Sequence, residues 1–169
     1  MSEAIGVSVD SLCLAYQIHS TNVRLVKSED RGLGIIKERP YNDIDGLITN
    51  EKDISLVTFY ADCIPLFLLD TKNKAIGLSH SGWRGTVNKM AKATLDKMSK
   101  EFGTQAKDII ACVGPGICKT CYEVSEDVYQ EFKNKFFEGN LEDIFTPNTK
   151  EHYQLDLLKA NKLILLDAG

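Results

Sequence analysis

Apolar runs, several of them rich in β-branched and aromatic side chains, alternate with polar turn residues along much of the chain. Short runs of this kind, bounded by Gly, Pro, Asn or Asp, are typical of buried or half-buried β-strands. We predict strands at 12–18, 23–26, 45–49, 54–60, 64–70, 74–80 and 108–114. The chain is therefore expected to build at least one sheet from its first two thirds.

Helical periodicity appears in three places. Thr86 is predicted to open a helix, because apolar residues then recur at helical spacing with lysines on the opposite side. Those apolar positions are Val87, Met90, Ala91, Thr94, Leu95 and Met98. Ser125, followed by two acidic residues, is a good N-cap for a helix running to about Phe136. Residues 153–166 are interpreted as a final helix whose last residues could equally form a strand.

Strands grouped early and interleaved with few helices, without regular βαβ alternation, predict an α+β fold or mixed α/β layers. A chain of 169 residues with 43% hydrophobic and 26% charged residues suits one globular domain with a substantial core. The apolar run that stops at 165–169 indicates a single domain, 1–169, that lacks terminal stretches of a longer fold.

The net charge of −4, with scattered basic residues, disfavours general nucleic-acid binding, because neutralising phosphates requires a basic surface. No secretory signal pattern opens the sequence, and the longest apolar run, 64–69, is too short to span a bilayer. We therefore expect a cytoplasmic protein with no membrane partner. In that compartment its five cysteines are expected to be thiols or metal ligands rather than disulfides.

A hairpin argument brings a cysteine and a histidine together. If 71–74 forms the turn between two strands, Pro65 pairs with His80, and Cys63 lies diagonal to His80 on the same face. Diagonal neighbours have Cα atoms roughly 7–8 Å apart. This separation suits two side chains that meet at a metal, or a thiol–imidazole pair.

His19 offers a third ligand, because it stands where a predicted strand gives way to a polar turn. Two histidines, one cysteine and a water would form an open tetrahedral zinc site. The alternatives are that His19 is an ordinary surface or core residue and that Cys63 is a small buried hydrophobe. His152 is predicted to lie in a polar loop before the last helix.

Seven segments occur in an order that resembles the multicopper polyphenol oxidase or laccase-domain family, also called the YfiH or purine nucleoside phosphorylase family. They are QIHS (17–20), DGLIT (45–49), ADCIPLFLLD (61–70), HSGWRGT (80–86), VGPGI (113–117), CYEV (121–124) and LDLLKAN (155–161). The resemblance implies a layered αββα sandwich with mixed sheets. It also implies metal ligands at His19, Cys63 and His80, and nucleoside and phosphate as small-molecule substrates. The implied activities are phosphorolysis of adenosine, inosine and methylthioadenosine, deamination of adenosine, and, under an older label, copper-dependent laccase activity.

The chain departs from the family pattern in two ways. An N-terminal Asn-Arg element and C-terminal Cys-Thr and Tyr-Arg-Arg elements do not occur, so part of the expected substrate pocket is missing. Cys118 stands where small residues are usual, which creates a local pair with Cys121. Because a zinc knuckle needs a second pair, we interpret both as structural thiols.

Counting ligands argues against laccase chemistry. Three histidines cannot build a trinuclear copper centre in addition to a blue-copper site, so copper is expected only as an occupant of the zinc site. Zinc lowers the pKa of a bound water to about 7, and hydroxide attack on C6 of adenosine gives deamination. Asp62 is the candidate proton shuttle, although regular strand alternation would turn it away from Cys63. It could instead bond to neighbouring backbone.

Phosphorolysis needs an anion site. Arg84 lies just before the predicted helix, whose N-terminus would favour phosphate, and is assigned to phosphate or developing negative charge. A surface salt bridge is its alternative role. Gly114 and Gly116 could form a second backbone cradle, and Trp83 could stack on a base or belong to the core.

Two rival functions use the same residues. Cys63 and His80 could be the nucleophile and base of a cysteine hydrolase or amidase, or the site could be a non-catalytic zinc module. We favour a zinc-dependent enzyme that processes purine nucleosides, with phosphorolysis first and deamination second.

Overall fold

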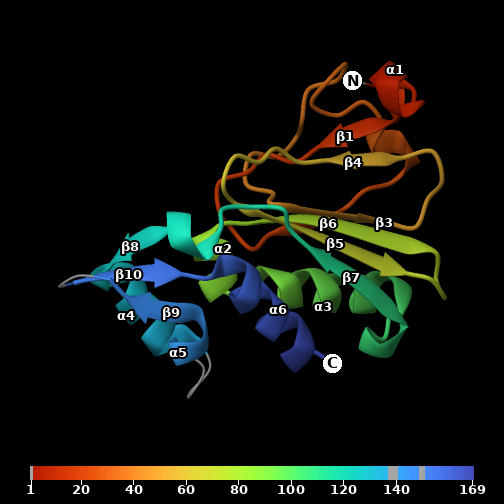
Figure 1. Ribbon diagram of the computed structural model, residues 1–169. Helices are drawn as coiled ribbons and strands as arrows, with labels where there is room; N and C mark the ends of the chain where they lie inside the picture. Colours follow the sequence, from red (N-terminus) through yellow and green to blue (C-terminus); the bar gives the residue numbers. More distant parts are fainter. Residues whose placement is uncertain (1, 137–140, 149–150) are drawn as a thin grey trace.

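A mixed five-stranded sheet forms the centre of the computed structural model, which describes residues 2–136, 141–148 and 151–169 (Figure 1). Its strand order is β2 (Val23–Leu25), β3 (Gly46–Thr49), β6 (Ala75–Ser81), β5 (Ile64–Asp70) and β7 (Ile109–Val113). β2 runs parallel to β3, and the other neighbours are antiparallel. The predicted hairpin register is confirmed, because Pro65 pairs with His80.

Two smaller sheets flank this centre. β1 (Leu12–Leu14) and β4 (Ser55–Val57) pair in parallel, and β8 (Glu123–Ser125), β10 (His152–Leu155) and β9 (Phe145–Pro147) form an antiparallel sheet. The strands predicted at 12–18 and 54–60 are shorter than expected. Beyond β4 the Gln17 amide bonds both backbone groups of Phe59, each at 2.7 Å, and replaces the strand ladder.

Helices α3 and α6 lie against one side of the central sheet, and the β1–β4 pair lies over the other (Figure 1). The described α-helices are α1 (Ser2–Ile5), α2 (Trp83–Val87), α3 (Met90–Phe102), α4 (Glu126–Lys135), α5 (Leu141–Ile144) and α6 (Leu157–Asp167). Short 3-10 turns are η1 (Val9–Ser11), η2 (Ser28–Asp30), η3 (Ala106–Asp108) and η4 (Lys119–Cys121). The predicted α+β class is confirmed. Within the described ranges, no helix has the length and apolar content needed to cross a bilayer.

The helix predicted to open at Thr86 begins three residues earlier, at Trp83, and is then interrupted. Lys89 adopts a left-handed conformation with φ 62°, which ends α2 before α3 starts at Met90. The predicted apolar face of α3 is nevertheless buried against the sheet. Sequence periodicity therefore located the buried face but not the break.

The prediction of one helix over 153–166 is wrong in its first part. Residues His152–Leu155 pair with β8 and β9 instead, and α6 starts at Leu157. The carboxylate of Asp156 accepts a hydrogen bond from the Lys159 amide at 2.8 Å and so caps the new helix start. Ser125 does precede α4 as predicted, although its hydroxyl bonds the Asp127 side chain rather than a helix amide.

Candidate metal centre

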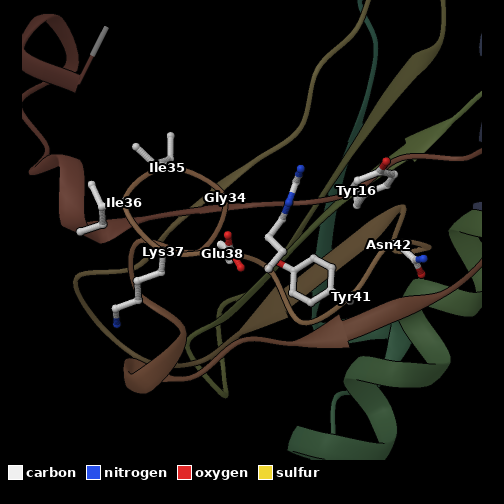
Figure 2. Close-up of a pocket in the computed structure, with 9 residues that line it drawn as sticks. Tyr16, Gly34, Ile35, Ile36, Lys37, Glu38, Tyr41 and Asn42 are labelled. Carbon is white, nitrogen blue, oxygen red and sulfur yellow. The ribbon is translucent and has the colours of Figure 1, made fainter.

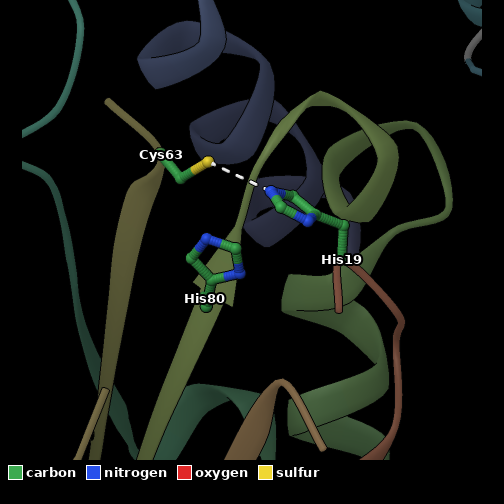
Figure 3. A group of neighbouring side chains, drawn as sticks. All are labelled: His19, Cys63 and His80. Carbon is green, nitrogen blue, oxygen red and sulfur yellow. Dashed lines mark hydrogen bonds between the residues drawn. The ribbon is translucent and has the colours of Figure 1, made fainter. Parts of the chain in front are cut away.

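His19, Cys63 and His80 converge from three separate segments of the chain. Their ligand atoms all lie within 4.8 Å of one another, and Figure 3 shows the side chains grouped around one point. The Cys63 sulfur is 3.8 Å from His19 Nε2, and the two imidazole rings are edge to face with centroids 4.9 Å apart. The structure thus brings together all three residues that the sequence analysis selected.

This donor set fits a tetrahedral metal ion. Zinc–sulfur and zinc–nitrogen bonds of about 2.3 Å and 2.0 Å place tetrahedral S and N ligands roughly 3.5 Å apart, close to the observed separation. His19 is exposed, Cys63 is half-buried and His80 is buried, so the group is open on one side. The three residues could therefore hold a metal ion and leave a coordination position accessible.

A buried carboxylate that the sequence analysis did not select organises two of these donors. Asp45 accepts a hydrogen bond from His80 Nδ1 at 2.8 Å, which leaves Nε2 as the potential metal ligand. The same carboxylate accepts the backbone amides of Ile18, His19 and Ser20 at 2.8–3.0 Å. These bonds hold the turn in which His19 has an unusual positive φ of 66°. Such outer-shell carboxylates typically orient metal-binding histidines.

The charges of this pair follow from its hydrogen bonds. Burial would raise the pKa of Asp45, but the bonds from His80 and from backbone amides lower it to about 2. Burial alone would lower the pKa of His80, because it disfavours the charged imidazolium. Hydrogen bonds to Asp45 and Cys63 outweigh this effect and raise the pKa to about 9. A metal cation at Nε2 would replace the proton that this environment favours.

Gly82 makes the close approach of the donors possible. A Cβ atom at this position would lie 2.8 Å from His19 Cδ2 and 2.9 Å from the Cys63 sulfur. Its φ of −74° is ordinary, so space rather than backbone conformation requires glycine here. A larger residue at position 82 would therefore displace His19 or Cys63 from its place in the centre.

A buried polar network supports the end of β6 behind the centre. The Ser81 hydroxyl bonds Thr86 Oγ1 at 3.0 Å and Asn161 Oδ1 at 2.9 Å. The Asn161 amide donates to Thr86 Oγ1 and to the Leu157 carbonyl, both at 2.9 Å. The network ties α2 and α6 to the strand that carries His80.

Two tyrosines also lie near the donors and were not singled out from the sequence. The Tyr60 ring is 5.7 Å from the His80 ring, and its hydroxyl donates to the Ser79 carbonyl at 3.1 Å. Burial raises the pKa of Tyr122 to about 12, with a further contribution from the charge of Cys63. Isolated tyrosines give no sequence signal that distinguishes them from core residues.

Arg84 and Trp83 line a pocket that also contains His19. Its volume is about 420 Å³. The remaining lining residues are Val87, Asn88, Asp127, Glu131 and Lys135. The guanidinium of Arg84 stacks on the Trp83 ring at 4.3 Å. Arg84 lies inside α2, so the expected placement just before a helix N-terminus is wrong. Arg84 and His19 nevertheless line the same pocket.

The other predicted residues lie beside Cys63 rather than in this pocket. Asp62 is exposed and precedes β5, so strand alternation does not apply to it. Its carbonyl accepts the Ile117 amide at 2.9 Å. Gly114 has a φ of 96°, and a Cβ on Gly116 would lie 3.1–3.2 Å from the carbonyls of Asp62 and Cys63. Gly116 lets the loop pack on the Cys63 segment, whereas a Cβ on Gly114 would meet Leu158 Cδ2 at 2.8 Å. Neither glycine lines the Arg84 pocket.

His152 takes no part in the centre. It lies at the start of β10 rather than in a loop, and its Nδ1 is 3.2 Å from the exposed carboxylate of Glu123. Among the residues that the structure describes, the group of His19, Cys63 and His80 is the one that could hold a metal through three such donors.

A second pocket, of about 540 Å³, lies around the loop at 34–42 and contains none of the three donors (Figure 2). The Arg39 guanidinium stacks on Tyr16 at 4.7 Å and donates to the Ala15 carbonyl at 2.5 Å. These contacts engage the Arg39 guanidinium within the protein, while Lys37 and Glu38 also line the pocket.

Comparisons with known proteins show the family of the chain. The family model described as multi-copper polyphenol oxidoreductase laccase matches residues 1–169. The chain is 37% identical to adenosine deaminase RL5 from an unknown prokaryotic organism, over 98% of this chain and 63% of that protein. It is 34% identical to purine nucleoside phosphorylase YlmD of Bacillus subtilis, over 100% of this chain and 60% of the relative. The chain thus spans about three fifths of the length of these relatives.

Solved structures show the same fold. A Bacillus licheniformis hypothetical protein, YfiH, superposes with a TM-score of 0.91 at 27% identity, over 99% of this chain and 63% of that one. YlmD from Geobacillus stearothermophilus gives the same TM-score and identity, over 99% of this chain and 62% of its own. Together with the full-length family match, these likenesses show that the chain belongs to the multi-copper polyphenol oxidoreductase laccase family.

Proposed function

We propose that this chain belongs to a zinc-dependent enzyme that processes purine nucleosides, by phosphorolysis first and adenosine deamination second. The observation that carries the proposal is the convergence of His19, Cys63 and His80 within 4.8 Å. The names of the relatives, adenosine deaminase and purine nucleoside phosphorylase, support purine nucleosides as the substrate class.

The three donors suit a single zinc ion better than a centre of several copper ions. The chain has three histidines, too few for the several imidazoles of coupled copper sites. Copper(II) could still compete for the same three donors, because it outbinds zinc at equal ligands. When bound with an open position, zinc supplies Lewis acidity that polarises an oxygen atom and lowers its pKa.

The residues around the donors divide the remaining work. Asp45 orients the His80 ring and holds the His19 turn, which fixes two donors before a metal arrives. Arg84, at the pocket that contains His19, is proposed to bind the phosphate that attacks C1′ of the ribose. Trp83 is proposed to offer a stacking surface for the purine.

Asp62 is proposed to move the proton. Its carboxylate is exposed one residue before Cys63, so substrate and solvent can both reach it. In phosphorolysis a purine nitrogen gains a proton as the glycosidic bond breaks. In deamination the amino group gains a proton as it leaves as ammonia. Backbone contacts from Gly114 and Gly116 to the substrate remain a prediction.

A cysteine hydrolase with Cys63 as nucleophile and His80 as base is the alternative, because the ligand atoms of these two residues lie within 4.8 Å of each other. A thiolate that ligates zinc is not a free nucleophile, so iodoacetamide separates the two functions. The proposal expects stoichiometric zinc and an unlabelled Cys63. Rapid labelling of Cys63 in metal-free native protein would favour the hydrolase.

The decisive assay measures base release from inosine with and without phosphate, and ammonia release from adenosine. We expect activity in the zinc-loaded protein and a loss of about a hundredfold or more in Cys63→Ser. Cys112→Ser, which changes an exposed thiol on β7, is the matched control and should keep full activity. Equal turnover by Cys63→Ser, or no turnover by the zinc-loaded wild type, would refute the proposal for this chain.

A further inference from the structure

Cys118 and Cys121 form an exposed thiol pair outside the metal centre. They flank one short turn, in which Cys118 precedes η4 and the Cys121 amide donates to the Cys118 carbonyl at 3.0 Å. Both side chains are exposed, so the interpretation as structural thiols does not describe them well. Two cysteines separated by two residues in an accessible turn are typical of reactive dithiols.

The surroundings make the two thiols unequal. The Cys118 sulfur lies 3.2 Å from Thr120 Oγ1. Hydrogen bonds from the Cys121 thiol first, then from the Thr120 hydroxyl and nearby amides, lower the pKa of Cys118 to about 7. The interaction with Cys118 raises the pKa of Cys121. The surroundings therefore favour the thiolate of Cys118 over that of Cys121.

We propose that Cys118 and Cys121 are a redox-active dithiol that reacts with low-molecular-weight disulfides and closes to an intramolecular disulfide. The Cys118 thiolate attacks one sulfur of the disulfide RSSR, forms a mixed disulfide and releases RS⁻. The Cys121 thiol then loses its proton and attacks the Cys118 sulfur, which releases the second RS⁻. Two thiols are oxidised and one RSSR is reduced to two thiols, so atoms and electrons balance.

The pair lies next to the metal centre without belonging to it. Neither sulfur is part of the group of His19, Cys63 and His80. The same loop bonds the Cys63 segment, because the Ile117 amide donates to the Asp62 carbonyl at 2.9 Å. A thiol pair here can react while Cys63 is engaged by a metal.

Peptide mapping tests the proposal. Zinc-loaded protein is incubated near pH 7 with oxidised glutathione, quenched in acid, alkylated and digested with trypsin. Trypsin cleaves after Lys119, so a disulfide between Cys118 and Cys121 joins peptides 108–119 and 120–133. Cys112 shares the first peptide, and the Cys112→Ser variant therefore identifies which thiol is linked.

We expect linked peptides in the wild type and in Cys112→Ser, and none in Cys118→Ser. In Cys121→Ser, Cys118 should accumulate as the glutathione mixed disulfide, because the thiol that would displace glutathione is missing. Absence of the link in folded wild type, its loss in Cys112→Ser, or a link to Cys63 would overturn the proposal.

Discussion

Replacing Asp45 with asparagine tests how the protein fixes two of its three donors. One carboxylate oxygen accepts His80 Nδ1 and the His19 amide, and the other accepts the amides of Ile18 and Ser20 and the Ser20 hydroxyl. An asparagine side chain has a single oxygen. In either orientation its NH₂ group faces N–H donors that the carboxylate now satisfies.

The expected cost follows from this count. Asp45 is fully buried, so water cannot replace the lost acceptor. Losing two charge-assisted hydrogen bonds and leaving their donors unpaired should lower the free energy of unfolding by about 3–5 kcal/mol. Loosened His19 and His80 should weaken zinc binding roughly tenfold to a hundredfold, as for other outer-shell carboxylates.

Two measurements on Asp45→Asn check these magnitudes. Urea unfolding of the metal-free protein gives the change in stability, and competition with a chromophoric chelator gives the zinc dissociation constant. Asp43→Asn is the matched control, because Asp43 lies two residues before Asp45 and its side chain accepts only an exposed hydrogen bond, from Asn22. It should change either quantity little. A zinc dissociation constant for Asp45→Asn equal to that of Asp43→Asn would refute the reasoning.

Three further changes test other parts of the structure. Gly82→Ala should reduce zinc affinity, because its Cβ would lie 2.8–2.9 Å from the side chains of two metal ligands. Gly85→Ala should leave the affinity unchanged, because its Cβ would have its nearest contact at 3.5 Å. Equal zinc dissociation constants for the two variants, measured by competition with a chelator, would contradict this expectation. Asn161→Ala should lower the free energy of unfolding by about 2–3 kcal/mol, because two buried hydroxyls lose a hydrogen-bond partner. If urea unfolding shows a smaller loss of stability than an alanine substitution at an exposed position causes, the network does not stabilise the fold. Burial would raise the pKa of Asp70, but the Asn73 amide and other donors lower it to about 2, below the ordinary value of an aspartate. Asp70 therefore stabilises the fold above about pH 4 and loses this contribution as the pH falls toward 2, so wild type should lose about 1 kcal/mol more than Asp70→Asn between about pH 5 and about pH 3. Parallel pH profiles would show that Asp70 does not contribute.

The β5–β6 hairpin shows what the sequence could predict. Two apolar runs joined by a short polar turn leave one register that keeps Ile64, Leu66 and Leu68 on the buried face. That register sets Pro65 opposite His80, as observed. Strand period and turn length are local properties, so they could be worked out without the tertiary structure.

Asp45 shows what the sequence could not predict. It stands 35 residues before His80, and its five hydrogen bonds exist only after β3 and β6 pair and the His19 turn folds over them. The residues of β10 likewise carry a helical pattern and form a strand because β8 and β9 supply partners. In both cases tertiary contacts, rather than local preference, decide the outcome.

Cobalt(II) titration is the most direct test of the claim that His19, Cys63 and His80 hold one divalent ion. A cysteine thiolate bound to cobalt gives a charge-transfer absorption band that imidazole and carboxylate ligands do not give. We predict that this band saturates at one equivalent of cobalt in the wild type and in Cys112→Ser, and disappears in Cys63→Ser. No band in the wild type, or an undiminished band in Cys63→Ser, would contradict the assignment of the centre.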